Sequence, residues 1–148
     1  MDSKNIIQTL LADLKSYIDD KTVIFETYME RATDLEPRQD IPRARIALYH
    51  GVENVTVKVG AEKPADSRQA YHVQISVLKA YRGDDGSKGE LPCLELRDKV
   101  VGWSIGLEPR SVTGEIFTLS YDSSSAFFRD KRYVTLTLNF TAFRKLIT

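Results

Sequence analysis

The sequence predicts an α+β fold in which a mainly antiparallel or mixed β-sheet carries two helices packed on one face. Three observations predict it. The first 18 residues have helical periodicity, the regions 45–59, 71–77, 115–121 and 133–143 alternate apolar with polar residues, and a second helical segment lies between the second and third of these regions. Strands joined by turns rather than by crossover helices favour antiparallel pairing with the helices on one face.

Composition limits the class of protein. A chain of 148 residues fits a single domain, 1–148, that buries roughly 70% of its unfolded surface. The 21 basic and 21 acidic residues cancel, so we expect no sequence-specific nucleic-acid partner and no membrane partner. No apolar run approaches the ~20 residues that cross a bilayer, and the polar N-terminus does not resemble a signal peptide. The single cysteine, Cys93, excludes an intramolecular disulfide and fits a reducing cytoplasm.

The N-terminal region predicts an amphipathic helix over 5–18, with Ser3 as its N-cap. Its apolar stripe consists of Ile6, Ile7, Leu10, Leu11, Leu14, Tyr17 and Ile18. The next region, 22–34, is ambiguous, because Val23 and Phe25 fit strand alternation whereas Ile24, Tyr28 and Met29 fit a helical stripe. Both interpretations stay open.

Period-two alternation then predicts the strands. In the region 45–59 the alternation changes parity across Gly51, as a turn or a β-bulge there would require. The other strands are 71–77, one around 115–121, and 133–143. Polar stretches rich in glycine, proline or charge predict protruding loops near 60–69, 82–89 and 122–132.

The second helix is predicted to begin near Pro92 and to end near Gly102 or Gly106. Its apolar stripe is expected to be Leu91, Leu94, Val101 and Ile105, with Leu96, Val100 and Trp103 beside it.

Motifs for chemistry are weak. Gly102-Trp103-Ser104-Ile105-Gly106 has the spacing of a nucleophile elbow, but a helix rather than a strand precedes it and no histidine follows it. The two histidines, His50 and His72, lack further ligands at metal-binding spacing and are expected at the surface. Asp84 and Asp85 could bind a hard cation, although two acids in a glycine turn are usually only solvated. We therefore expect no enzyme, no catalytic residue, no cofactor and no metal.

Two features suggest contacts with other molecules. Phe127 and Phe128 are adjacent aromatics in a polar connection, so one or both either return to the core or make an intermolecular contact. The polar side of 133–143 is an uncharged row that suits either solvent or a neighbouring subunit. That row consists of Thr135, Thr137, Asn139 and Thr141.

The layout resembles the tail terminator proteins of long-tailed bacteriophages. Members of that family have an N-terminal amphipathic helix like 5–18, strands with long polar loops, a second helix like 91–103, and a final alternating strand like Tyr133-Val-Thr-Leu-Thr-Leu-Asn-Phe-Thr-Ala-Phe143. The resemblance is one of pattern over most of the chain, and 22–34 has no counterpart in the layout.

The resemblance implies a virion protein: a homohexameric ring at the head-proximal end of the tail, assembled in the host cytoplasm. Such a ring ends polymerisation of the tail tube and offers its other face for head-to-tail joining. Its partners would be further copies of itself, the tail tube protein and a neck or connector protein, with DNA passing through the ring lumen. A ring needs two different complementary patches. We expect these among Lys63, Arg68, Asp84, Asp85, Phe127, Phe128, Arg129 and Asp130.

Three alternatives stay open: another head–tail connector or tail-completion protein, a small intracellular enzyme that uses Ser104, and an intracellular binding module.

Overall fold

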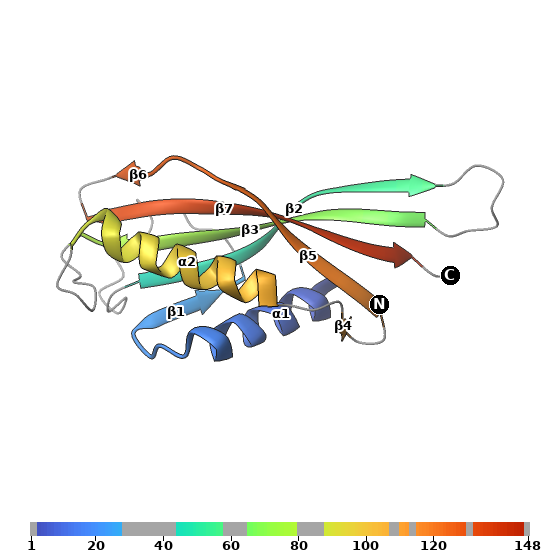
Figure 1. Ribbon diagram of the computed structural model, residues 1–148, viewed down its shortest axis with the longest axis horizontal. Coiled ribbons are helices and arrows are strands. Elements are labelled where there is room, and N and C mark those ends of the chain that lie inside the picture. Colours follow the sequence, from blue (N-terminus) through green and yellow to red (C-terminus); the bar gives the residue numbers. More distant parts are fainter. Residues whose placement is uncertain are drawn as a thin grey trace.

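The computed structural model describes residues 3–27, 44–57, 65–79, 88–106, 110–112, 115–129 and 132–146. In this part of the chain a seven-stranded mixed sheet carries both helices on one face (Figure 1). Helix α1 (Ser3–Ile18) packs against β1, β2 and α2, while α2 (Glu90–Gly106) packs against β3, β5 and β7. The predicted α+β class is confirmed.

The sheet order is β1-β2-β3-β7-β5-β4, and β6 also pairs with β7. The strands are β1 (Val23–Glu26), β2 (Ala44–Val57), β3 (Ala65–Leu78), β4 (Arg110–Val112), β5 (Glu115–Ser124), β6 (Phe128–Arg129) and β7 (Tyr133–Leu146). Only the β1–β2 pair among them is parallel. The long strand predicted over 133–143 lies at the centre of the sheet, between β3 and β5.

Helix α1 is amphipathic as predicted, with Ile6, Leu10 and Leu14 almost fully buried. It already includes Ser3, the predicted N-cap. The helix ends where Asp19 takes a left-handed backbone conformation (φ 48°), and the Asp20 carboxylate accepts hydrogen bonds from the Thr22 amide and hydroxyl at 2.8 and 2.6 Å. This turn leads directly into β1, so the ambiguous region begins as a strand.

Two predictions for strand ends were wrong. Residues 65–69, expected in a loop, belong to β3 and pair with both β2 and β7. Within 122–132, β5 runs on to Ser124 and β6 pairs with β7, so this connection follows the sheet rather than protruding. Between β5 and β6, Ser125 continues the hydrogen bonding to β7. Its amide donates to the Thr137 carbonyl (2.8 Å), and its Oγ accepts from the Thr137 amide (3.0 Å).

At Gly51 the parity change is a bulge and not a turn: β2 continues, and its register against β3 shifts between His50 and Glu53. A Cβ at Gly51 would meet the His72 ring and would lie 3.0 Å from the Ala70 Cβ. The bulge therefore requires a residue without a side chain at this point.

Helix α2 is rotated relative to the prediction. The residues that it buries against the sheet are Cys93, Leu96, Val100 and Trp103, whereas Leu91 and Ile105 are exposed. Trp103 donates from its indole nitrogen to Asp13 Oδ2 (2.8 Å) and so ties α2 to α1. Neither described helix has the length and apolar content to span a membrane.

Candidate interaction surfaces

The sheet face opposite the helices is polar, and side chains from β1, β2, β3, β5 and β7 meet on it. Cross-strand register aligns Arg45 on β2, Ser76 on β3 and Thr135 on β7 in one row. The closed half of this face is the part nearest β1, around Arg45, Ser76 and Thr135. The open half is the part past the Gly51 bulge, around Val52, Arg68 and Phe143.

On the closed half the polar side chains are buried. Arg45 has no exposed surface, and its guanidinium donates to Glu26 Oε2 at 3.2 Å and to Gln74 Oε1 at 2.9 Å. Ser76 and Thr135 are buried too, with 3.2 Å between their hydroxyl oxygens. Because a buried charge is tolerated only when it is paired and hydrogen-bonded, this network fixes which side chains meet on this face.

At the centre of the face, His72 Nδ1 lies 2.7 Å from Asn139 Oδ1, and Asn139 Nδ2 donates to Ser123 Oγ at 3.1 Å. Because the Asn139 amide nitrogen faces Ser123, its amide oxygen faces His72. That oxygen can only accept a hydrogen bond, so His72 Nδ1 is the donor. Tyr49 stacks at 5.2 Å from the His72 ring, and burial raises the pKa of the Tyr49 phenol against an opposing hydrogen bond with Thr137.

The polar row predicted on β7 therefore lies on this face but is not a free surface. Thr135 is buried, while the side chains of Thr137, Asn139 and Thr141 are half-buried and hydrogen-bonded to Tyr49 on β2, Ser123 on β5 and Asp122 on β5, respectively. His72 was expected at the surface and is instead half-buried in the same network.

The open half carries a groove of about 400 Å³, lined mainly by Val52, Arg68, Asp122, Thr141 and Phe143. Val52 is 69% exposed and Phe143 41%, which is high for apolar side chains this large. The Arg68 guanidinium lies over the Phe143 ring, 5.2 Å from its centroid, and Asp122 accepts a hydrogen bond from Thr141 Oγ1. The groove thus combines apolar walls with one charge of each sign.

On the opposite side of the molecule, α2 presents a second apolar surface. Leu91, Leu94, Asp98 and Ile105 recur at spacings of three, four and seven, and we call them the outer stripe of α2. Ile105 is the most exposed of the large apolar side chains in the described residues, at 77%. A helix with apolar residues on both faces is expected to be covered on both.

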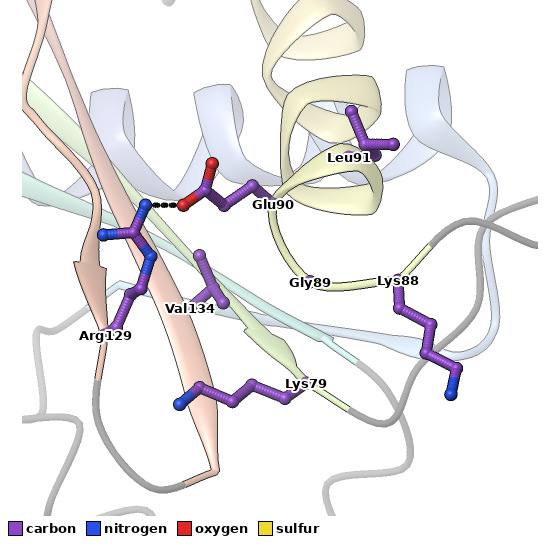
Figure 2. Close-up of a pocket in the computed structure, with 7 residues that line it drawn as sticks. All are labelled: Lys79, Lys88, Gly89, Glu90, Leu91, Arg129 and Val134. Atoms are coloured by element: carbon purple, nitrogen blue, oxygen red, sulfur yellow. Dashed lines mark ion pairs between the residues drawn. The ribbon is translucent and has the colours of Figure 1, made fainter.

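A third surface surrounds the start of α2, where Lys79, Lys88, Arg129 and Glu90 line an open pocket (Figure 2). Arg129 forms an ion pair with Glu90. Figure 2 shows the amino groups of Lys79 and Lys88 pointing in different directions. The positive charges do not converge, so the geometry does not form an anion-binding site.

The predicted interface residues that the structure describes lie in two separate places. Phe127 packs against the core, with the Arg129 guanidinium 6.0 Å from its ring centroid, whereas Phe128 is 58% exposed. Arg68 lies in the groove, about 26 Å along β7 from Phe128, since their register partners Phe143 and Thr135 are eight residues apart. Lys63, Asp84, Asp85 and Asp130 lie outside the described residues.

Sequence reasoning missed Val52, Asp122 and Phe143 in the groove, and Asp98 on α2. One available signal was the parity change at Gly51, which makes Val52 an extra residue of a bulge. Another was that Leu91 and Ile105 cannot share one helix face with Leu96 and Trp103.

The groups considered for chemistry are placed unfavourably for it. Ser104 is buried in α2 and its hydroxyl donates to the Val101 carbonyl of the same helix at 2.7 Å, so it is not on a strand-to-helix elbow. Burial raises the pKa of the Cys93 thiol to about 12, with Arg97 opposing the shift, so the thiol is neutral at physiological pH. Within the described residues no cluster of three or more His, Cys, Asp or Glu side chains could hold a metal ion.

The fold and these surfaces describe an α+β protein with two different apolar patches on opposite sides of one sheet. The chain matches no protein-family model and no curated protein sequence.

Proposed function

We propose that this protein is a structural component of a phage tail. In this proposal it forms a ring, a hexamer, at the head-proximal end of the tail tube, where it ends tube polymerisation and provides the surface for head-to-tail joining. The function is assembly rather than catalysis.

The observation that carries the proposal is the presence of two non-equivalent apolar surfaces on opposite sides of the sheet. The groove lies on the polar face of the sheet, and the outer stripe lies on the side of α2 that faces away from the sheet. A ring needs a heterologous contact, in which one patch meets a different patch on the neighbour, and two such patches on opposite sides let each copy contact two neighbours.

The element order adds support. The sequence resembles the tail terminator proteins by an N-terminal amphipathic helix, strands with long polar loops, a second helix and a closing pair of strands, and the described elements follow each other in a compatible order. The buried hydroxyl of Ser104 and the neutral Cys93 thiol weigh against the enzyme alternative.

Two measurements test the proposal. Native mass spectrometry of the purified protein should give a hexamer of about 101 kDa, six times the chain mass of 16.8 kDa. Deletion of the gene should give tails of irregular length, and electron microscopy of labelled particles should find the protein at the tube end nearest the head.

Tails of normal length in the deletion strain would end the proposal. A label on the portal side of the neck would instead favour another connector protein.

A further inference from the structure

We propose that the outer stripe of α2 in one copy docks into the groove of the next copy. In this contact Ile105 lies against Val52 and Phe143, and Asp98 pairs with Arg68. The inference deepens the proposed function and rests on it in one respect, namely that it takes a second copy of this chain as the occupant of the groove.

The first argument is that both surfaces lack a partner within the described chain. Ile105 and Leu91 are 77% and 54% exposed on α2, and Val52 and Phe143 are 69% and 41% exposed at the groove. Apolar side chains gathered in this way, with charged residues beside them, mark protein–protein contacts more often than solvated surface.

The second argument is charge complementarity. The stripe carries Asp98, whose side chain is 70% exposed and accepts hydrogen bonds from Arg97 of the same helix at 3.2 and 3.0 Å, so its exposed carboxylate can take a second basic partner. The groove has one charge of each sign, because Arg68 lies over Phe143 while Asp122 lies on the other side of β7. Docking therefore offers Asp98 to Arg68.

The third argument is size. The stripe from Asp98 to Ile105 is about 10 Å long, since a helix rises about 1.5 Å per residue. Arg68 on β3 and Asp122 on β5 flank β7 and are separated across the strands by about 10 Å, twice the spacing of neighbouring strands, and they are offset along β7 by about three residues. The C-terminal half of α2 thus matches the width of the groove.

Symmetric pairing fits less well. If α2 packed against α2 of a second copy about a two-fold axis at the middle of the stripe, the two Asp98 carboxylates would meet, and like charges at an interface weaken it. Pairing of stripe with groove has no such conflict, and because the two surfaces lie on opposite sides of the sheet it leads to a ring or a chain of subunits.

The test begins with two variants that each damage one surface, Ile105→Asp and Val52→Asp. Thr9→Asp is the matched control, because Thr9 is exposed on α1 and takes the same new charge. Circular dichroism and urea midpoints establish that all three fold. Sedimentation velocity should then show Ile105→Asp and Val52→Asp self-associating about 30-fold more weakly than wild type, the loss typical of one interface hot spot, and Thr9→Asp assembling like wild type.

Mixing separates a head-to-tail contact from other arrangements. Ile105→Asp retains an intact groove and Val52→Asp an intact stripe, so an equimolar mixture should form heterodimers that neither variant forms alone, and nothing larger. The charge exchange gives a second check: Asp98→Arg and Arg68→Asp should each weaken assembly, and the double variant should recover it.

The outcomes distinguish the two proposals. Wild-type protein that is oligomeric, together with variants that assemble normally or fail to complement on mixing, overturns the docking inference and leaves the ring. Protein that is monomeric at every concentration, with and without tail tubes, overturns both.

Discussion

The buried Arg45 network gives the sharpest prediction for stability. Replacing Arg45 by Met keeps the packing of its aliphatic stem but leaves the Glu26 carboxylate, whose side chain is 13% exposed, and the Gln74 amide without the guanidinium that they now bind. Removal of one partner of a buried ion pair typically costs 3–5 kcal/mol. We expect a loss of about 4 kcal/mol, which lowers the urea midpoint by about 2 M at a slope of about 2 kcal/mol per M.

The matched control is Arg129→Met, which removes an arginine from an ion pair whose side chains are 56% and 37% exposed. Exposed pairs contribute about 0–1 kcal/mol, so this variant should unfold near the wild-type midpoint. The double variant Arg45→Met Glu26→Met should recover much of the loss, because replacing both partners of a buried pair by apolar groups is often neutral. Equal midpoints for Arg45→Met and Arg129→Met would refute the reasoning.

Three further predictions concern packing and titration. Gly51→Ala should cost about 1–3 kcal/mol through overpacking against His72, and less than that in a His72→Ala background; equal costs in urea titrations of both backgrounds would contradict the proposed crowding. Leu14→Ala should cost about 2–5 kcal/mol by urea unfolding, because Leu14 is fully buried. Since the Cys93 pKa rises from 9.0 to about 12 on folding, the unfolded state loses the thiol proton first, and stability should fall between pH 9 and pH 12 more steeply in wild type than in Cys93→Ala.

The parts of the fold that were predictable are those where one side of an element meets the core and the other does not. Helix α1 and the central strands β3 and β7 have this property, so their periodicity in sequence is clear. The region of β1 was not decidable from pattern, since four residues fit either period and their pairing with β2 is a long-range contact. The strand at 65–69 was missed because it contains Asp66, Ser67, Arg68 and Gln69, with no apolar alternation.

Helix α2 was predicted but oriented wrongly, and the reason is physical. Its sequence has two apolar stripes on opposite sides, Cys93-Leu96-Val100-Trp103 and Leu91-Leu94-Ile105, and periodicity alone does not say which one faces the sheet. Trp103 decides it through its hydrogen bond to Asp13, a contact 90 positions away in sequence. Of the predicted interface residues, Arg68 and Phe128 are exposed, and Phe127 returned to the core because the connection follows β7 instead of leaving the sheet.

The two halves of the polar face have different consequences for mutation. On the closed half the side chains of Arg45, Ser76 and Thr135 are hydrogen-bonded within the chain, so a change there removes a folded-state interaction and should alter the urea midpoint. On the open half Val52 is 69% exposed, so its replacement by a polar residue should leave the midpoint nearly unchanged and alter only assembly. If substitutions on the closed half change the urea midpoint, and substitutions on the open half change only self-association, the open half is the part of this face that contacts a neighbouring molecule.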